Sequence, residues 1–473
     1  MLGSETPLQE PENDDLWWSR PGGFREVLTL SGPLVASSLS WTVMNFVDRV
    51  FLMSYSEDTV AAALPAGVVF FTLTCLPLGV AMYVTTFVSQ YHGAGRPERI
   101  GPAVWQGLIL TAIGTPVIWL AIPWAETWFR LAKHAPEIAA LETVYFQICC
   151  VGAPAIIAAG ALSGFFTGRG HARVVMVVDV LAAVVNVVLD WLWIFGLYGF
   201  PEAGIAGAAW ATVVALWFKA VVYFAMFLYA GRDGTFGARC GFGWDTDLMR
   251  RLLRYGGPNG MQMVIEVGAF TIFLLLLGQL GKHELAASSL AFNMNNLAFM
   301  PAWGVGMATS TLVGQYLGRE RPDLAARSTW TALAVTTIYM AIISAVYIGL
   351  PDLILAAHWT AGEIEQDDVL RQTLPTLLWF VASYSLFDGM NVIFAGAIKG
   401  AGDTRFIMFT NLVLGTSIVC ATWYAITQAG VGLYGAWTIL TLWVCSLGVI
   451  FGARFLQGRW RTMRVIEEQV PIE

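Results

Sequence analysis

Charged residues are scarce in this chain: Asp, Glu, Lys and Arg make up 12% of its 473 residues, while 57% are hydrophobic. Soluble domains carry about 25% charged residues, so the composition excludes a soluble globular protein. Apolar runs of about 20 residues, the length that crosses a bilayer, recur along nearly the whole chain. The sequence therefore predicts an all-α integral membrane protein with little chain left for a soluble domain.

Signatures of other protein classes are missing as well. The six cysteines include no close CxxC pair, which argues against a disulfide framework and a structural zinc site. The N-terminal stretch is acidic, the opposite of the basic start of a signal peptide. The five histidines show no metal-ligand spacing, and HExxH, GxSxG and phosphate-loop motifs are absent. We therefore expect a protein that is not an enzyme and that has neither a bound cofactor nor a nucleic-acid partner.

Hydropathy between polar stretches predicts twelve membrane helices. Their expected ranges are 26–53, 58–90, 102–123, 137–166, 172–196, 203–230, 249–280, 283–316, 325–349, 367–398, 404–428 and 431–456. Lys and Arg concentrate in alternate connections and near both chain ends, and only Arg130, Lys133, Lys282 and Arg371 fall on the other side. The positive-inside rule therefore predicts a multi-pass protein of the plasma (inner) membrane with both termini in the cytoplasm.

The sequence also repeats itself with an offset of 225 residues. The offset superimposes REVLTLSGP (25–33) on RRLLRYGGP (250–258), VSQYHGAGRPE (88–98) on VGQYLGRERPD (313–323), Gly79 on Gly304 and Gln90 on Gln315. Later in each half, GRGHAR (168–173) matches GAGDTR (400–405) once loop lengths shift the offset slightly. A register kept over this distance is poorly explained by chance.

Six helices in each repeat is an even number, so both halves enter and leave the membrane on the same side. They are therefore expected to be parallel repeats, an arrangement that places a substrate pathway at their interface. The expected organisation is a polar cytoplasmic tail (1–25), an N-lobe (26–230), a Gly-rich cytoplasmic linker (231–248), a C-lobe (249–456) and a cytoplasmic C-terminal tail (457–473).

Few charges fall inside the predicted helices. The acids are Asp48, Asp179, Asp190, Glu266 and Asp388, and the only bases are Arg49 and Lys219. A charge at the bilayer centre costs at least about 2.5 kcal/mol, so each should face protein or water and have a role. The excess of acids predicts an electronegative pathway that favours cationic, amphipathic compounds.

Asp48 lies near the outer end of its helix, beside Arg49. Two interpretations are open: an ion site, or a charge pair that reaches toward the membrane surface. Neighbours in sequence point about 100° apart on a helix and do not meet readily, which favours a site. The roles of Arg49 and Lys219 are left open by the sequence.

The fifth predicted helix carries a polar stripe of Asp179, Asn186 and Asp190. Spacings of seven and four residues place all three within about 40° on one face. Asn186 and Asp190 can offer a carbonyl and a carboxylate oxygen to one hard cation. The alternative is a hydrogen-bonded spine between helices, and this suits Asp179 best because it lies nearer the cytoplasmic end.

A second acidic group lies in the second half. Glu266 is deep in the seventh predicted helix, and Tyr384 and Asp388 are one turn apart on the tenth. Neither helix supplies a base, so we expect these acids to hold a cation or take up a proton. Such chemistry couples ion binding to a change of conformation.

The motifs together resemble a known family. The chain carries Pro33 and Asp48 in the first helix, VSQYHGAG (88–95), GIAGAAWAT (204–212), Glu266, VGQYLG (313–318) and GAIKGAGDTR (396–405). In order, spacing and repetition these resemble multidrug and toxic compound extrusion (MATE) transporters of the NorM-like branch, over residues 25–456.

This resemblance implies a fold and an activity. The fold is twelve helices in two six-helix lobes around a V-shaped cavity, and the activity is antiport of organic cations against Na⁺ or H⁺. The implied cation-binding residues are Asp48, Asn186, Asp190 and Thr212 in the N-lobe, with Glu266, Tyr384 and Asp388 in the C-lobe, and either cluster could hold Na⁺. Pro33 matches the proline at which the first helix of the family is proposed to bend. We expect a monomer whose partners are organic cations and membrane lipid.

One position departs from the NorM-like pattern, because an acid at Asp190 is more typical of the DinF-like branch. The coupling ion and the lobe that drives transport therefore stay open. The main alternative function is a lipid-linked oligosaccharide flippase, which would need basic residues in the cavity to hold pyrophosphate. Two further functions are possible. An intramembrane aspartyl enzyme would have no use for the internal repeat, and a channel would show substrate flux without counter-ion exchange.

Overall fold

The computed structural model describes residues 18–132, 134–239, 241–350 and 368–467. Over these ranges the regular structure is helical throughout, with no strand. Eleven helices in the described part of the chain are long and apolar enough to cross a membrane, and α6 with α7, bent by 43°, make a twelfth span. The predicted all-α multi-pass fold is confirmed.

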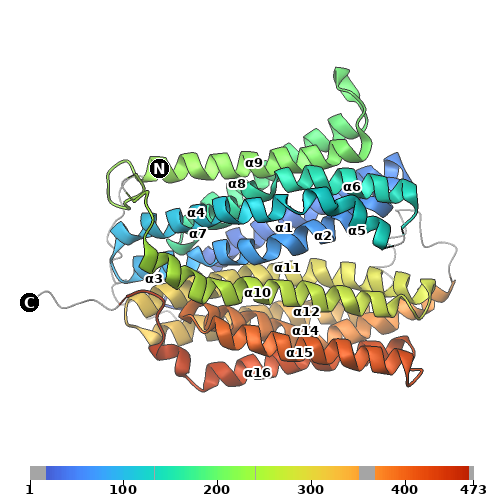
Figure 1. Ribbon diagram of the computed structural model, residues 1–473. Helices are drawn as coiled ribbons and strands as arrows, with labels where there is room; N and C mark the ends of the chain where they lie inside the picture. The colour runs from blue at the N-terminus through green and yellow to red at the C-terminus, as the bar shows by residue number, and fades with distance from the viewer. Residues whose placement is uncertain (1–17, 133, 240, 351–367, 468–473) are drawn as a thin grey trace, which may run out of the picture.

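The helices follow the predicted ranges closely (Figure 1). The N-lobe holds α1 (Phe24–Tyr55), α2 (Glu57–Met82), α3 (Val84–Gly93), α4 (Ile100–Trp119), α5 (Ala125–Leu131), α6 (Pro136–Val151), α7 (Ala153–Gly168), α8 (Ala172–Ile194) and α9 (Gly204–Ala230). The C-lobe holds α10 (Thr246–Leu277), α11 (Lys282–Gly318), α12 (Pro322–Gly349), α14 (Asp368–Ala401), α15 (Thr404–Thr427) and α16 (Leu433–Leu456).

Three details differ from the predicted helices. The second span is interrupted at Tyr83, between α2 and α3. The fourth bends at Gly152, where Pro154 in the first turn of α7 has no N–H to bond the carbonyl of Cys150. The short helix α5 was not predicted, because the charged residues Glu126 and Arg130, which form an ion pair (2.6 Å), lower the hydropathy of this seven-residue segment. By contrast, α1 continues through Pro33 without interruption.

Local signals explain where several helices begin. Ser56 ends α1 and caps α2 by accepting from the N–H of Asp58 (3.3 Å). Asp245 caps α10 by accepting from the N–H of Leu248 (3.0 Å). Both side chains satisfy a backbone N–H that has no partner within the helix.

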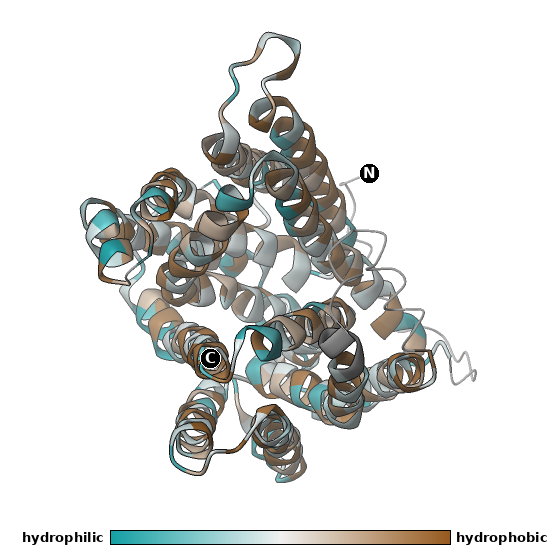
Figure 2. Cartoon of the chain, turned by 90° about the vertical axis from the view of Figure 1, so that its right-hand side faces the viewer, coloured by the Kyte–Doolittle hydropathy of each residue, from teal (hydrophilic) through white to brown (hydrophobic). Residues whose placement is uncertain are grey.

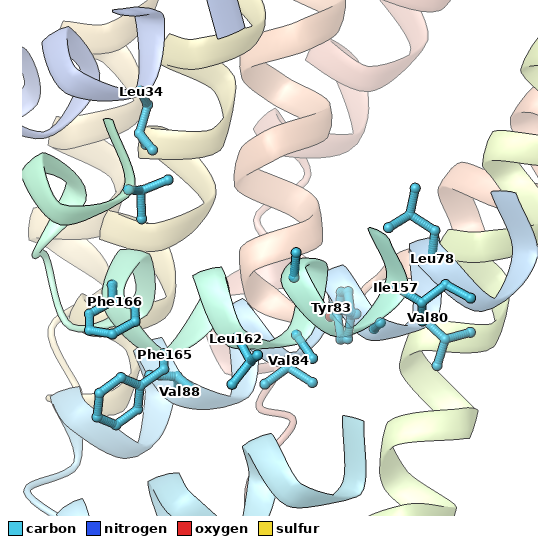
Figure 3. Close-up of a cluster of buried hydrophobic side chains, with 14 of the residues drawn as sticks. Leu34, Leu78, Val80, Tyr83, Val84, Val88, Ile157, Leu162, Phe165 and Phe166 are labelled. Carbon is cyan, nitrogen blue, oxygen red and sulfur yellow. The ribbon is translucent and has the colours of Figure 1, made fainter. Parts of the chain in front are cut away.

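The buried apolar side chains form two clusters. One cluster of the C-lobe joins α10, α11, α12, α14, α15 and α16 around Phe273 and Trp437. The larger cluster fills the N-lobe and continues into the C-lobe; Figure 3 shows the part that includes Val84, Val88 and Leu162. Viewed along the helices, hydrophobic residues occur throughout the bundle (Figure 2), and many large apolar side chains are exposed, as lipid contact requires.

The predicted linker is folded against the N-lobe. The indole N–H of Trp105 in α4 donates to the carbonyl of Ala238 (2.7 Å), and Gln106 donates to the carbonyl of Gly243 (2.8 Å). The guanidinium of Arg169 lies over the Phe236 ring, 3.9 Å from its centre. These contacts hold the chain to the N-lobe before α10 begins.

The lobes meet through two equivalent helix pairs, α1 with α11 and α2 with α10. A Cβ added at Gly79 would lie 2.5 Å from Cα of Gly260, and one at Gly304 would lie 2.7 Å from the backbone N of Val35. The 225-residue offset relates Gly79 to Gly304 and Val35 to Gly260. The repeat seen in the sequence is therefore a repeat of the contact between the lobes.

Replacing Gly79 by Ala is expected to weaken the contact between the lobes, because the new methyl group overlaps the backbone of α10. Overpacking of this kind typically costs about 1–3 kcal/mol. Thermal unfolding of the purified protein in detergent should show a lower midpoint. The matched control is Gly67→Ala on the same helix, where a Cβ meets nothing within 4 Å and Ala only improves helix propensity. Equal midpoints for both variants would contradict the close crossing.

Candidate functional site

The predicted N-lobe residues are brought together by α1, α8 and α9. Asn186 and Asp190 of α8 are fully buried. In the amide orientation that gives both side-chain atoms of Asn186 a partner, its nitrogen donates to Asp190 Oδ2 (3.0 Å). Its oxygen then accepts from the backbone N–H of Thr212 in α9 (3.3 Å). Asp48 of α1 lies within electrostatic range of Asp190.

This cluster is left with unused acceptor capacity. Oδ1 of Asp48 and Oδ1 of Asp190 are both buried, and neither has a hydrogen-bond partner among the described residues. A buried acceptor without a partner costs about 1–3 kcal/mol, and more when it is charged. Two such oxygens near an amide and a hydroxyl make a suitable place for a proton or a hard cation.

Asp48 and its neighbour Arg49 lie in different surroundings. Arg49 is exposed, whereas the Oδ1 atom of Asp48 is buried. Arg49 acts on Asp48 through its electrostatic field, yet no ion pair joins the two in the part of the chain that the structure describes. A neighbouring charge pair at a helix end therefore does not account for Asp48.

Asp179 has a different environment from the rest of its stripe. Lys219 of α9 forms an ion pair with it (2.8 Å), and the Tyr223 hydroxyl donates to it (2.7 Å). The Ser37 hydroxyl of α1 donates to its second oxygen. Asp179 therefore ties α1, α8 and α9 together as the predicted polar spine, and Lys219 is its counter-charge.

A small pocket of about 30 Å³ lies between the spine and the acid pair. Ser37, Asp179, Thr212 and Lys219 are among its lining residues. Such a pocket holds one or two water molecules. The polar stripe of α8 is thus divided into a structural end at Asp179 and a site at Asn186 and Asp190.

The C-lobe residues lie on α10 and α14. Glu266 accepts from the side-chain amide of Gln262 one turn earlier (2.6 Å), and Asp388 accepts from Asn391 (3.4 Å). Tyr384 and Asp388 are buried and interact electrostatically, and Asp388 also lies within range of Glu266. The structure therefore gathers the three predicted residues into one neighbourhood.

The expectation that no base lies near these acids is wrong. α14 runs to Ala401, three residues beyond the predicted end, so Lys399 belongs to the helix. Lys399 and Glu266 interact electrostatically. The C-lobe acids are therefore partly balanced by a positive charge that the sequence analysis placed in a connection.

In the described part of the chain, no group of three or more His, Cys, Asp or Glu side chains is arranged to hold a metal. Each cluster has only two acids, with amide and hydroxyl groups beside them. This donor set fits a proton or a singly charged cation better than a tightly held divalent metal.

The repeated QY motifs have a structural use that the sequence did not reveal. Here we call the end of the bundle at which α1 begins and α16 ends the terminal end (left in Figure 1). Gln90 donates to the carbonyl of Gly400 (2.9 Å), and Gln315 donates to the carbonyl of Gly168 (2.8 Å). Each bond crosses between the lobes, and the repeat relates one bond to the other.

Glycines make this approach possible. A Cβ at Gly93 would lie 2.0 Å from the carbonyl oxygen of Gln315, and one at Gly318 would lie 2.3 Å from that of Gln90. The α3 and α11 backbones therefore touch directly at the terminal end. Together, Gln90, Gln315 and their glycine partners form what we call the reciprocal lock.

A tyrosine follows each of these glutamines, and each donates to a carboxylate. The Tyr316 hydroxyl donates to Glu26 (2.5 Å), and the Tyr91 hydroxyl donates to Glu467 (2.8 Å). The 225-residue offset places Arg251 where Glu26 stands in the first repeat. Arg251 forms an ion pair with Glu467. The C-terminal tail thus supplies the carboxylate that the second repeat lacks.

Glu467 is the centre of a charged network that spans both lobes. Besides Arg251 of the C-lobe it pairs with Arg96 (2.5 Å) and Arg99 (3.3 Å) of the N-lobe. Burial alone would raise the pKa of Glu467. Hydrogen bonds from its own backbone N–H, Arg251 and Tyr91 outweigh burial and lower the pKa to about 2. The carboxylate therefore stays ionised and paired at any physiological pH.

Comparison with known proteins agrees with this architecture. The MatE family model matches residues 33–192 and again residues 258–423. The chain belongs to the MatE family. The two MatE segments begin 225 residues apart, which is the offset of the internal repeat. Membership makes the chain a transporter and not an enzyme, and confirms the resemblance given by its motifs.

Curated MatE relatives extend over almost the whole chain. The multidrug resistance protein PmpM of Pseudomonas aeruginosa is 26% identical and aligns with 93% of this chain and 92% of its own length. A probable multidrug resistance protein NorM of Xanthomonas axonopodis pv. citri is 29% identical, with 92% and 95% covered. The NorM-like branch is therefore supported by full-length similarity.

Solved MatE structures share the fold. The outward-facing conformation of a multidrug resistance MATE family transporter of the MOP superfamily superimposes with a TM-score of 0.83 at 20% identity, over 93% of this chain and 96% of the other. The eukaryotic MATE transporter AtDTX14 gives a TM-score of 0.81 at 18% identity, over 93% and 96%.

The Glu467 network yields a prediction about pH. The folded-state pKa of about 2 lies below the ordinary value of 4.5, so the network stabilises the fold fully above about pH 4.5. This contribution should fade as pH falls from 4.5 toward 2. At pH 7, Glu467→Gln should lose roughly 1–2 kcal/mol of stability.

Thermal midpoints measured for both proteins between pH 7 and pH 3 test this. The gap between wild type and Glu467→Gln should be constant above pH 5 and should narrow below it. Asp233→Asn, a substitution of an exposed acid in the linker, is the control and should leave the midpoint unchanged. A gap that widens as the pH falls would contradict the assignment.

Proposed function

We propose that this chain is a secondary active multidrug exporter that exchanges organic, mostly cationic and amphipathic compounds for Na⁺ or H⁺ by alternating access. The names of its full-length relatives support drug export. Ion coupling is supported by the two buried carboxylates Asp48 and Asp190, because each has an oxygen without a hydrogen-bond partner among the described residues. Two buried acids within electrostatic range of each other favour uptake of one positive charge between them.

We assign the driving site to the N-lobe. Glu266 already accepts a hydrogen bond from Gln262 and interacts electrostatically with Lys399, so its negative charge is partly compensated. In the part of the chain that the structure describes, the exposed Arg49 is the only base that acts on Asp48, and none acts on Asp190. An incoming cation therefore gains more in the N-lobe, whereas the C-lobe acids suit recognition of a cationic substrate. This assignment addresses the departure from the NorM-like pattern at Asp190.

Alternating access then follows from the contacts between the lobes. The hydrogen bonds of the reciprocal lock join the lobes at the terminal end. Ser38 in α1, which donates to the carbonyl of Met300 (3.0 Å), makes a further contact toward the middle of α1. Cation uptake at Asp48 and Asp190 changes the charge between α1 and α8, and α1 is the helix that packs on α11 of the other lobe. Binding of the ion can therefore change the contact between the two lobes.

The terminal end is proposed to face the cytoplasm, because its connections carry most of the Lys and Arg residues. The protein would then lie in the inner membrane as a monomer with both termini inside. Ion entry down its gradient is worth about 2.3 kcal/mol per charge per 100 mV, plus any concentration difference. This energy drives export against the substrate gradient.

The flippase alternative finds no support. It would need bases free to hold pyrophosphate. Lys219 is engaged by Asp179, Lys399 lies near Glu266, and Arg49 is exposed. Neutral or cationic cargo fits these surroundings better than a doubly charged anion.

Asp48→Asn and Asp190→Asn should each reduce ion-driven efflux to background, because each removes one of the two charges that bind the ion. The assay is substrate efflux from proteoliposomes under an imposed Na⁺ gradient and, separately, a pH gradient. Arg49→Gln is the matched control on the same helix and should keep efflux near wild type. Wild-type efflux by both Asp variants under both gradients would contradict the N-lobe assignment.

Glu266→Gln and Asp388→Asn should impair export of cationic substrates while leaving ion binding measurable. Isothermal titration with Na⁺, or proton release on substrate addition, separates the two functions. Gln262→Ala serves as a milder variant that removes only a hydrogen bond to Glu266. If the C-lobe variants lose ion binding and the N-lobe variants keep it, the roles of the lobes are reversed.

A further inference from the structure

A cavity of about 320 Å³ opens at the terminal end, away from both acid clusters. It lies where α10 begins, where α14 turns into α15, and where the C-terminal tail passes over both. Its polar walls come from Arg254, Asp403, Arg405 and Arg464. No step of the proposed transport cycle uses it.

The charges around this cavity do not balance. Asp403 is held by Arg454 outside the lining, at 2.8 and 2.7 Å, and Arg464 pairs with Glu320 at 3.0 Å. Arg254 and Arg405 are exposed, and in the described ranges neither has a carboxylate within ion-pair distance. The cavity therefore presents two uncompensated guanidinium groups, which suit an anion.

The start of α15 adds to this. Ala401, Gly402 and Asp403 line the cavity, and the 24-residue helix begins at the next residue. Asp403 makes no capping hydrogen bond with its side chain, because that side chain is bound to Arg454. The first N–H groups of the helix are thus left for another acceptor, and helix N-termini with nearby Arg bind phosphate groups well.

The surroundings favour a lipid over a free ion. α10 and α15 pack side by side. Beside the arginines their outer faces expose apolar side chains: Leu253 (47%), Phe409 (56%) and Val413 (62%). A phosphate held by Arg254 and Arg405 would have acyl chains beside these residues. Basic pockets at the cytoplasmic ends of membrane helices recognise anionic headgroups in this way.

We propose that this cavity binds the phosphate-bearing headgroup of an anionic membrane lipid. Arg254 and Arg405 contact the phosphate, and Met463 and Arg464 of the tail form the remaining wall. The same tail continues to Glu467, which pairs with arginines of both lobes. A bound lipid therefore also fixes the tail that completes the charged network. This proposal does not depend on the transport cycle.

The internal repeat provides a matched control. The first repeat places Arg173 at the start of α8, in the position that Arg405 has at the start of α15. There, Thr29 stands in place of Arg254. Arg173 is exposed, and so is Arg405. A general attraction of lipid to exposed arginine would affect both positions equally, whereas a built site would affect only Arg405.

The test uses the full-length protein, delipidated in a neutral detergent. Phosphatidylglycerol, phosphatidylcholine and inorganic phosphate are titrated separately, with binding followed by native mass spectrometry and thermal midpoint. We expect phosphatidylglycerol to bind and raise the midpoint, and the other two to do neither. The double variant Arg254→Ala/Arg405→Ala should bind phosphatidylglycerol about tenfold more weakly or worse, as loss of charge-assisted hydrogen bonds predicts. Arg173→Ala should bind as the wild type does.

Three results would overturn the proposal. One is equal binding of phosphatidylglycerol by the double variant, and another is an equal loss in Arg173→Ala. The third is stabilisation by inorganic phosphate alone as strong as that by the lipid, which would assign the cavity to a free anion. An unchanged midpoint of the double variant without lipid shows that it folds. Because binding is the readout, failure here is distinct from failure of ion-coupled efflux.

Discussion

The contact between the lobes at the terminal end rests on one hydrogen-bonding arrangement made twice. Gln90 reaches Gly400 in the opposite lobe, and Gln315 reaches Gly168. In a bilayer, a backbone carbonyl that accepts no hydrogen bond within its own helix needs a hydrogen-bond donor from elsewhere in the protein. The two glutamines provide that partner at the turn that ends α7 and α14. Since Gly93 and Gly318 let the backbones touch, the bonds form without side chains holding the lobes apart.

Around this contact the two repeats are equivalent in backbone and different in charge. The position that corresponds to Asp48 is Phe273, which is fully buried in the core of the C-lobe. The C-lobe acids therefore come from other positions, on α10 and α14. Because the two lobes share a scaffold but differ in their acids, one lobe can bind the ion while the other binds the substrate. The same contrast occurs at the terminal end, where Glu26 and Arg251 occupy equivalent positions with opposite charge.

Much of this could be predicted from sequence, for physical reasons. Membrane helices are long apolar runs, so their ranges were predicted within a few residues, and the repeat predicted which glycines and glutamines would be equivalent. The polar stripe on α8 followed from helical periodicity. Its division could not be predicted, because Asp179 becomes a spine residue only through Lys219 and Tyr223 on α9. Lys399 was missed because the predicted helix ends at residue 398, three residues before the end of α14 at Ala401.

The tail shows most clearly where sequence periodicity gives no information. Residues 459–467 belong to neither repeat and are too polar to span a membrane, so their pattern predicts only a cytoplasmic tail. Trp460 is nevertheless buried, stacked on Phe455 with 4.9 Å between ring centres, and this anchors the tail beneath the C-lobe. From that anchor the backbone N–H of Val465 reaches the side-chain oxygen of Gln90 (2.8 Å). Gln90 thus bonds both Gly400 and the tail, whereas among the described residues the side chain of Gln315 bonds only Gly168. The N-terminal segment serves the other side of the lock, where Tyr316 donates to Glu26 (2.5 Å) and Thr331 donates to the carbonyl of Gly22 (2.9 Å). Opening the terminal end must therefore break contacts made by segments near both chain ends, one on each side of the reciprocal lock.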